Sequence, residues 1–272
     1  MRPTLISLQN NQVKNLVKLR QRRQRQSQGL MLIDGVRALH LAIVNDFSIQ
    51  IIYYDEERPD PGLLHLAEEY AISLQPVTSS VFQKIGYGDN PDGHLGLATS
   101  PELELRSFPE PTGIDSLYVV VEEVEKPGNL GAILRSADAA GVAGVMVCTP
   151  VTDIANPNII RASQGTFFTV PIALTITPNA RQWLHDHQVQ ILAATPAAER
   201  CYTDFDLSRP TAIVVGAEST GLSKAWLSEQ TIRVPMAGQV DSLNVAQTAT
   251  ILIFEAARQR GFPKKKHHEI FS

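Results

Sequence analysis

Three segments in the second half of the chain join a β-rich apolar run to a helix-like stretch through a loop that carries glycine and polar residues. They read NLGAILRSADAAG from Asn129, IVVGAESTGLS from Ile213 and VPMAGQVDSLNVAQTA from Val234. Strand ends expose backbone N–H groups, and glycine lets a ligand come close to the backbone. Three such junctions can therefore build one site from distant parts of the chain.

The segment from residue 114 onward alternates between strand-like and helix-like runs. Its strand-like runs lack the apolar–polar alternation of a half-exposed sheet, which indicates a sheet covered on both faces. The sequence therefore predicts an α/β fold with a mostly parallel sheet flanked by helices. The predicted strands are 116–121, 144–148, 166–170, 189–193, 211–215 and 231–234, and the predicted helices include 129–140, 179–187 and 243–260.

The first hundred residues predict a smaller α/β domain. Apolar residues at helical spacing predict a helix over 11–26, which Gly29 would end. Three prolines and a glycine among charged residues predict a linker at 101–113. The predicted organisation is thus a domain at 1–100, this linker, and a second domain at 114–272. Further predicted elements of the first domain are a strand at 30–34, a helix at 35–45, a strand at 49–54, a helix at 61–70 and shorter strand-like stretches up to 98.

The composition is that of a globular protein: 43% of the 272 residues are hydrophobic and 19% are charged, so a core can form without disulfides or a structural metal. The two cysteines, Cys148 and Cys201, predict reduced thiols and a cytoplasmic location. We expect no metal site, because no Cys/His cluster has zinc-ligand spacing and His267 and His268 follow a lysine run at a tail. The start lacks the apolar core of a signal peptide, and no apolar run is long enough for a membrane span.

Positive charge is concentrated in the first 40 residues, which hold eight basic residues and one acidic residue, Asp34. The rest of the chain is acidic, so the net charge of −4 conceals a basic arm on an acidic body. A solvated helix face is the ordinary explanation of such a run, but KNLVKLRQRRQRQSQ contains no acid to pair with its cations. The arm therefore favours a polyanionic partner, RNA or DNA. The predicted RNA-binding residues are Lys14, Lys18, Arg20, Arg22, Arg23 and Arg25.

Several nucleotide-binding and hydrolase motifs are absent. The chain has no G-x-G-x-x-G sequence, which disfavours an ordinary dinucleotide-binding turn. Gly216 and Gly221 have the spacing of a P-loop, but Leu222 stands where the phosphate-binding lysine must be. The absence of G-x-S-x-G also disfavours an α/β-hydrolase.

Polar side chains accompany each of the three glycine-bearing loops. Asn129 lies at the start of a predicted helix, where it can simply be an N-cap, and Arg135 follows six residues later. Arg135 stands among small apolar residues and needs an anionic acceptor such as a carboxylate or a phosphate. Glu218 can accept backbone N–H bonds in its turn, and Ser242 and Asn244 can cap the helix that follows. Each residue alone has a structural explanation, but the combination favours a functional site.

These residues resemble the motifs of the SpoU (TrmH-like) family of SPOUT RNA 2′-O-ribose methyltransferases. The resemblance covers residues from about 114 to 260, and the front part resembles the family's ribosomal-protein-like substrate-binding domain. The first motif matches Asn129, Gly131, Arg135 and Ala137, the second matches Gly216, Glu218, Gly221 and Leu222, and the third matches Pro235, Met236, Gly238, Ser242, Leu243, Asn244 and Val245.

The resemblance implies transfer of a methyl group from S-adenosyl-L-methionine to a ribose 2′-hydroxyl of RNA, with rRNA favoured over tRNA. It implies a deep trefoil knot, in which the carboxyl-terminal segment threads a loop, an exception to ordinary chain topology. It also implies a homodimer through the knotted domain. The predicted helix from 243 is apolar nearly all round, so either its own domain or a second subunit must cover it.

The family's site residues carry over to matching positions. The implied catalytic residues are Arg135, Asn129, Glu218, Ser242 and Asn244, and the implied cofactor-binding residues are Thr195, Gly216, Val234, Met236 and Leu243. Because a guanidinium keeps its proton, we expect Arg135 to hold a phosphate and stabilise a developing alkoxide rather than act as a base. Ala246 and Ser219 depart from a frequent serine and glycine of the family, which bears on substrate choice. The alternatives are a tRNA 2′-O-methyltransferase of the same family, a non-catalytic RNA-binding protein that retains the fold, and an ordinary Rossmann-type nucleotide-dependent enzyme.

Overall fold

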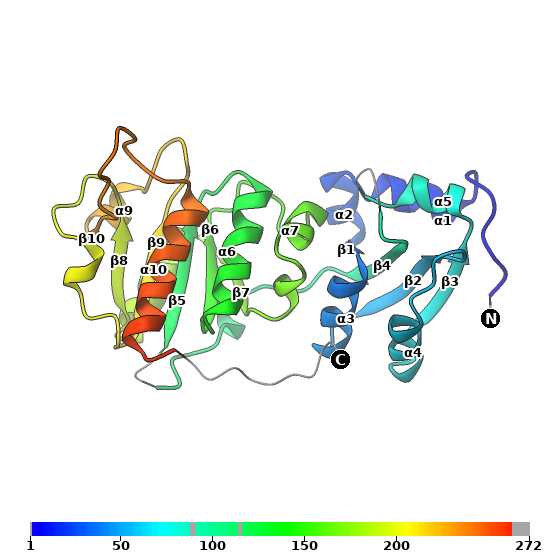
Figure 1. The fold of residues 1–272 in the computed structure, drawn as a ribbon, viewed down its shortest axis with the longest axis horizontal. Helices are drawn as coiled ribbons and strands as arrows, with labels where there is room; N and C mark the ends of the chain where they lie inside the picture. The colour runs from blue at the N-terminus through cyan, green and yellow to red at the C-terminus, as the bar shows by residue number, and fades with distance from the viewer. Residues whose placement is uncertain (1, 88–90, 114–115, 263–272) are drawn as a thin grey trace. The chain divides into compact units, whose positions relative to one another are not determined.

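The computed structural model describes residues 2–87, 91–113 and 116–262 (Figure 1). The chain forms two compact units. The first comprises Met1–Leu103, Glu125–Arg135 and Pro150–Val170, and the second comprises Glu104–Val124, Ser136–Thr149 and Pro171–Ser272. These units do not coincide with the predicted domains, because two stretches of the second half of the chain pack with the first unit. His267 and His268 lie outside the described residues.

The first unit contains a four-stranded mixed sheet in the order β1-β4-β2-β3. β4 is antiparallel to β1 and β2, whereas β2 and β3 are parallel. The strands are β1 (Leu30–Asp34), β2 (Ile49–Asp55), β3 (Ser73–Val77) and β4 (His94–Thr99), and the helices are α1 (Asn11–Lys18), α2 (Arg22–Gln28), α3 (Val36–Val44), α4 (Pro61–Glu69), α5 (Ser79–Ile85), α7 (Pro157–Ala162) and the 3-10 turn η2 (Thr166–Phe168).

The helix predicted over 11–26 is in fact two helices. α1 ends at Leu19, whose side chain is fully buried, and α2 ends at Gly29 with φ at +63°. The chain turns between them so that Nη1 of Arg25 can donate to the backbone carbonyls of Leu19 and Arg20, each at 2.8 Å. The carbonyls at a helix end lack partners within the helix, so this bond stabilises the break.

The second unit contains a six-stranded sheet in the order β10-β8-β9-β5-β6-β7, and every pairing in it is parallel. The predicted parallel sheet is confirmed, but the strand predicted at 166–170 is wrong: this stretch contains η2, and the strand follows it as β7. The strands are β5 (Leu117–Glu122), β6 (Gly144–Cys148), β7 (Ile172–Thr175), β8 (Gln190–Ala194), β9 (Thr211–Val215) and β10 (Gln230–Ile232). The remaining helices are α6 (Pro127–Ala139), α8 (Thr177–Asp186), α9 (Lys224–Leu227) and α10 (Val245–Gln259), with 3-10 turns η1 (Leu105–Ser107) and η3 (Tyr202–Asp204).

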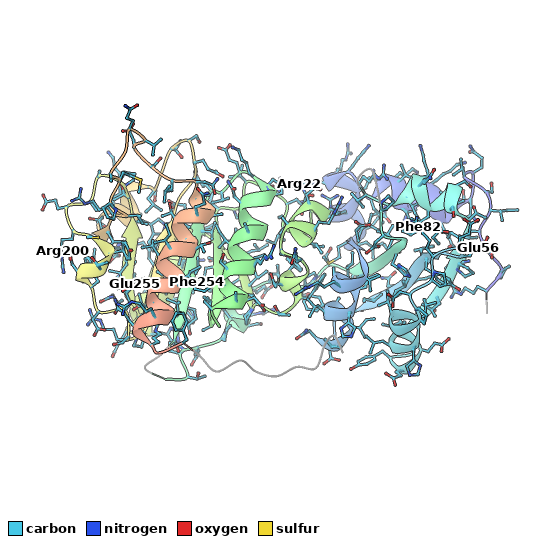
Figure 2. All side chains as sticks on the ribbon, in the orientation of Figure 1. Arg22, Glu56, Phe82, Arg200, Phe254 and Glu255 are labelled. Atoms are coloured by element: carbon cyan, nitrogen blue, oxygen red, sulfur yellow. The ribbon has the colours of Figure 1, made fainter. Side chains whose placement is uncertain are left out.

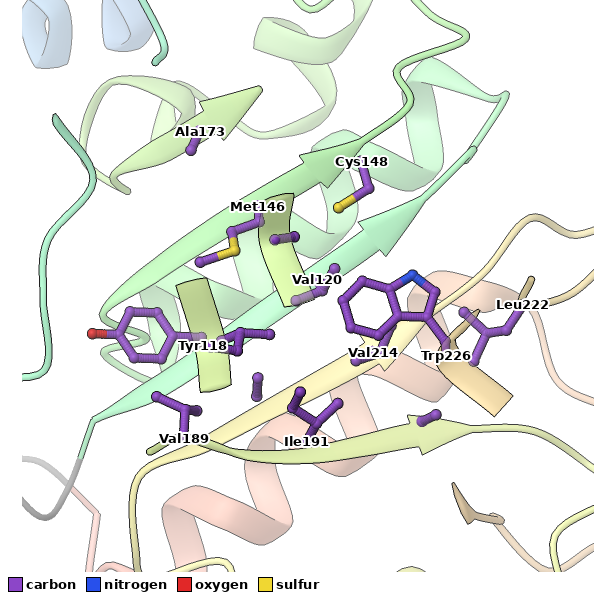
Figure 3. Packing of buried hydrophobic residues seen from close by; sticks show 14 of the residues in the cluster. Tyr118, Val120, Met146, Cys148, Ala173, Val189, Ile191, Val214, Leu222 and Trp226 are labelled. Carbon is purple, nitrogen blue, oxygen red and sulfur yellow. The ribbon is translucent and has the colours of Figure 1, made fainter. Parts of the chain in front are cut away.

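One apolar cluster of the second unit contains side chains from five neighbouring strands, β8, β9, β5, β6 and β7, with Trp226 of α9 fully buried among them (Figure 3). Phe108 belongs to the same cluster, and its ring leaves no room for a side chain at Gly144. The segment predicted as a linker therefore packs into the second unit from Glu104 onward, where Glu104 also bridges to Leu174.

No helix of the described ranges is long and apolar enough to cross a membrane. Over the same residues, the structure contains no group of three or more His, Cys, Asp or Glu side chains that could hold a metal ion.

Candidate active site

The carboxyl ends of β8, β9, β10 and β5 lie along one edge of the parallel sheet. Register fixes this arrangement, because Val121 pairs with Val215 and Ile232 pairs with Ala194. From β5 the chain proceeds to β6 and β7 on one side and then returns to β8 and β9 on the other. The order of strands reverses between β5 and β9, and parallel sheets bind ligands at the carboxyl ends next to such a reversal.

All five predicted cofactor-binding residues are half-buried. Thr195 directly follows β8, Gly216 directly follows β9, and Val234 comes two residues after β10. Met236 and Leu243 lie in the loop that continues from β10 to α10. These positions are where the buried strands reach the surface, so their backbone groups are accessible to a ligand at this edge.

The loop after β9 folds tightly back on itself. Ala217 and Gly221 form an antiparallel bridge, with the Gly221 N–H donating to the Ala217 carbonyl at 2.9 Å. A Cβ on Gly216 would lie 2.5 Å from the Gly221 carbonyl oxygen, and Gly221 itself has φ at +69°. Both glycines are therefore required by the turn, which exposes Glu218 at its tip.

A buried carboxylate that the sequence analysis missed anchors this loop. Glu122, the last residue of β5, is 4% exposed. Its Oε2 accepts the Ser223 backbone N–H at 2.8 Å, and its Oε1 accepts the hydroxyls of Ser223 and Thr177 at 2.9 and 2.6 Å. The carboxylate thus ties the end of the β9 loop to β5. In the sequence, the one signal that could have identified Glu122 is its position at the end of a predicted strand.

The start of α10 carries the third predicted motif. Asn244 is its N-cap, and its Oδ1 accepts the Ala246 N–H at 3.0 Å. The capping explanation of Asn244 is therefore correct. Ser242 lies exposed in the preceding loop.

Asn129 and Arg135 lie on α6. Asn129 is the third residue of this helix and half-buried, while Arg135 is exposed two turns from the helix start. Gly131 faces α7: a Cβ there would lie 2.5 Å from Ala162 Cβ and 2.8 Å from the Ile159 carbonyl oxygen. The glycine of the first motif is therefore explained by close packing of two helices.

The predicted catalytic residues fall into two groups. Glu218, Ser242 and Asn244 belong to the second unit, whereas Asn129 and Arg135 lie on the part of α6 that packs with the first. The next residue of α6, Ser136, shares a 2.7 Å hydroxyl–hydroxyl hydrogen bond with Thr250 of α10, so these two helices are neighbours within the second unit.

The basic arm divides into exposed and structural cations. Lys14, Lys18 and Arg23 are exposed. Arg20 and Arg22 are also exposed but donate to backbone carbonyls, Arg20 to Lys84 and Gly86 and Arg22 to Val151. The prediction for Arg25 needs correction: it is 4% exposed and forms an ion pair with Asp153 at 2.5 Å, an acid that lies 128 positions away.

The buried cysteine, Cys148, provides no nucleophile. Both cysteines are free thiols, as predicted, and Cys148 is buried. Burial and the nearby Glu122 carboxylate raise the pKa of the Cys148 thiol to about 12, so it stays neutral near pH 7.

Comparison with known proteins identifies two matching family models. Residues 116–254 match the SpoU rRNA methylase family, and residues 10–96 match an MRM3-like substrate-binding domain.

Individual relatives match along nearly the whole chain. A 23S rRNA (uridine(2479)-2′-O)-methyltransferase from Streptomyces viridochromogenes is 31% identical, over 88% of this chain and 86% of its own. A crystal structure of an RNA 2′-O ribose methyltransferase is 36% identical with a TM-score of 0.83, covering 96% of this chain and all of that one. An AdoMet-bound rRNA methyltransferase from Sinorhizobium meliloti is 29% identical with a TM-score of 0.85, covering 94% of this chain and 97% of that one.

Proposed function

The chain belongs to the SpoU rRNA methylase family, and from this premise we propose that it methylates the 2′-hydroxyl of a ribose in rRNA with S-adenosyl-L-methionine as methyl donor. The observation that carries the proposal is the row of half-buried residues at the carboxyl ends of β8, β9 and β10, which are the positions that the family's motifs assign to the cofactor.

The residues present fit such a cofactor. Thr195, Gly216 and Val234 follow adjacent parallel strands, so their backbone groups can converge on one ligand. The two glycines of the β9 loop keep its backbone free of side chains, and Glu122 holds that loop in place. When bound, S-adenosylmethionine supplies a methyl group on a sulfonium, an activated donor.

The protein's part is to align the ribose hydroxyl with the methyl donor and to stabilise negative charge on its oxygen, while the hydroxyl proton passes to water. We assign Arg135 to the phosphate of the target nucleotide and to the alkoxide that develops on the ribose. Asn129, Glu218, Ser242 and Asn244 orient the ribose and the loops around it. Alignment of this kind can contribute about 7–11 kcal/mol to lowering a barrier.

The first unit supplies RNA affinity in this proposal. Its exposed cations on α1 and α2 neutralise phosphates, and Arg25 holds the arm in shape through Asp153. The match of residues 10–96 to a substrate-binding domain supports the same division of roles.

We extend the proposal to assembly and location. The carboxyl-terminal segment threads a loop to form a trefoil knot, and two copies pair through the second unit. Phe254 supports pairing, since it is 38% exposed on a helix whose other face is buried (Figure 2). The two free thiols agree with the cytoplasm as the place where the protein works.

The direct test is to map 2′-O-methyl marks in rRNA and tRNA from cells with and without this protein, and to restore the lost mark in vitro with purified protein and labelled S-adenosylmethionine. We expect loss and recovery of a mark at an rRNA ribose. A mark lost from tRNA would select the tRNA alternative, and RNA binding without any transfer would select the non-catalytic one.

A further inference from the structure

A cavity of about 320 Å³ lies within the first unit. It is bounded by the start of α3, the residues before β4, and α7 with the turn after it. None of the predicted catalytic or cofactor-binding residues lines it. The lining residues are Asp34, Gly35, Arg37, Ala38, Pro91, Asp92, Ile160, Arg161, Gln164 and Gly165.

Asp34 is the unusual member of this cavity. It is 8% exposed, and its Oδ1 is buried without a hydrogen-bond partner among the described residues. Its Oδ2 lies 3.5 Å from Nε of Arg161, a long ion pair. Burying a carboxylate with one oxygen unpaired costs free energy. The cost agrees with the pKa of Asp34, which burial and the nearby Asp92 raise to about 6.

The neighbouring carboxylate is satisfied by contrast. Asp92 accepts the Val36 N–H at 2.8 Å through Oδ2 and the His94 N–H at 3.1 Å through Oδ1. Both oxygens of Asp92 therefore accept a backbone hydrogen bond, whereas Oδ1 of Asp34 accepts none from the described residues. A ligand that donates a hydrogen bond would pair with this oxygen.

The walls of the cavity restrict the ligand. Arg37 and Arg161 disfavour a purely cationic ligand such as a polyamine, and the two carboxylates disfavour a lone phosphate. A metal ion would need more oxygen or nitrogen ligands than this part of the described chain brings together. The remaining class is a ligand with hydrogen-bond donors at one end and an anion at the other.

We propose that this cavity binds a guanine nucleotide of the RNA substrate, with the base donating to Asp34 and the phosphate contacting Arg37. Guanine alone among the RNA bases presents two adjacent donors, N1–H and N2–H, which match a carboxylate; the other bases offer one donor next to acceptors. The cavity is at the small end of ligand pockets, which suits a single extruded nucleotide. This inference rests on the proposed function, and the nucleotide is recognised here rather than methylated.

The test measures binding of GMP and of IMP, which lacks the N2 amino group, to the full-length protein by isothermal titration. The same pair is then compared as the central nucleotide of short single-stranded RNAs, which separates an RNA nucleotide from a free one. The variants are Asp34→Asn, Arg37→Ala and, as a matched control on the same unit, the exposed Asp46→Asn. Asp46 has φ at 59°, which asparagine tolerates.

We expect guanine to bind about tenfold more tightly than hypoxanthine to the wild type and to Asp46→Asn. Asp34→Asn should abolish this preference while its melting temperature holds or rises, and Arg37→Ala should weaken GMP more than guanosine. Equal binding of GMP and IMP to the wild type, or an unchanged preference in Asp34→Asn, would overturn the inference. Binding of free GMP without a preference in RNA would also overturn it, since the ligand would then be a free nucleotide.

The two proposals fail separately. If the wild type transfers methyl groups but binds guanine no more tightly than hypoxanthine, the cavity assignment is wrong and the proposed function stands. If the protein prefers guanine in a way that depends on Asp34 but transfers no methyl group, the proposed function is wrong and the cavity assignment stands.

Discussion

At the scale of single residues, Asp34 and Asp55 are buried carboxylates of the first unit that differ in how they are paired. Burial and Asp92 raise the pKa of Asp34 to about 6, against a weaker opposing effect of Arg161. Burial also raises the pKa of Asp55, but hydrogen bonds from the Ser79 hydroxyl and the Arg58 guanidinium outweigh it and lower the pKa overall. The two groups therefore affect stability with opposite sign.

The first prediction concerns these two carboxylates. Because the native state binds the Asp34 proton more tightly than the unfolded chain, this group's contribution to stability falls as the pH rises from about 4 to about 6. Asp34→Asn removes the cost of burying the charge but loses the Arg161 ion pair, and it should stabilise the protein at pH 7 by about 1–3 kcal/mol. Asp55→Asn loses charge-assisted bonds and should destabilise it by about 1–3 kcal/mol.

Thermal unfolding of both variants and the wild type between pH 4.5 and 7.5 measures these effects. The difference between Asp34→Asn and the wild type should grow up to about pH 6 and then level off. A destabilised Asp34→Asn at pH 7 would show that the ion pair with Arg161 outweighs the cost of burying the carboxylate.

The second prediction concerns two glycines of α6. A Cβ on Gly131 would collide with backbone and side-chain atoms of α7, whereas nothing lies within 4 Å of the Cβ position on Gly128. Gly131→Ala should cost about 1–3 kcal/mol, and Gly128→Ala should be neutral or stabilising by up to about 1 kcal/mol. Chemical denaturation of the pair measures both, and equal effects would contradict the packing of α6 on α7.

Residue-level prediction from sequence succeeded where the cause was local and failed where it was distant. The local sequence predicts that Gly29, Gly216 and Gly221 lie where the chain turns, and that Asn244 can cap the helix that follows it. Arg25 could not be separated from its exposed neighbours, because its partner Asp153 lies on a segment far along the chain. The role of Glu122 could not be predicted for the same reason, because its partners Thr177 and Ser223 are distant in sequence and contact it only in the folded protein.

At the scale of elements, continuous apolar strands and glycine-bearing turns predicted most of the second unit. The misplaced strand at 166–170 shows the limit of that pattern, since its aromatic and β-branched residues are buried in a 3-10 turn instead. Phe167 and Phe168 pack there with Phe47 of the first unit, a tertiary contact that overrides local β preference. The break between α1 and α2 depends in part on a distant residue as well. Arg25 donates to the carbonyls of Leu19 and Arg20 at the break and also forms an ion pair with Asp153.

The third prediction concerns the basic arm formed by α1 and α2. Neutralising Arg20, Arg22 and Arg23 together should weaken RNA binding and flatten its dependence on salt, because each phosphate contact releases a counterion. Arg25→Ala should instead lower the melting temperature, since it leaves Asp153 without its ion pair. Fluorescence anisotropy across a salt series, with a thermal melt of each variant, measures both effects. An unchanged salt slope in the triple variant would contradict the role of the arm.

At the scale of the whole molecule, the sequence predicted two α/β parts divided by a linker at 101–113, and it did not predict that later stretches of the chain pack with the first part. Residues 125–135 and 150–170 pack with the first unit because α7 contacts β1 and η2 contacts α3. No change in composition marks the two stretches that pack with the first unit, because ordinary close contacts hold them there, such as that of Gly165 with Ala38. The linker at 101–113 was predicted from its prolines, its glycine and its charged residues, a pattern that does not reveal the burial of Phe108.

The fourth prediction is that two copies of the chain pair through α10. Phe254→Arg places a charge on the exposed side of this helix and should shift the protein to monomers, because a buried unpaired charge is costly. Tyr70→Arg is the matched control, since Tyr70 is 48% exposed on the first unit. Sedimentation velocity of the wild type and both variants decides the matter, and a wild type that is monomeric at every concentration would refute the pairing.

The most direct test of the account measures methyl transfer to rRNA and S-adenosylmethionine affinity in the same preparation of Arg135→Ala. Arg258→Ala is the control, an exposed arginine that pairs with Glu255 on α10. If Arg135 stabilises the developing alkoxide and does not hold the cofactor, Arg135→Ala loses transfer by at least about a hundredfold while its cofactor affinity stays within about threefold of the wild type. Full transfer by Arg135→Ala would contradict the account.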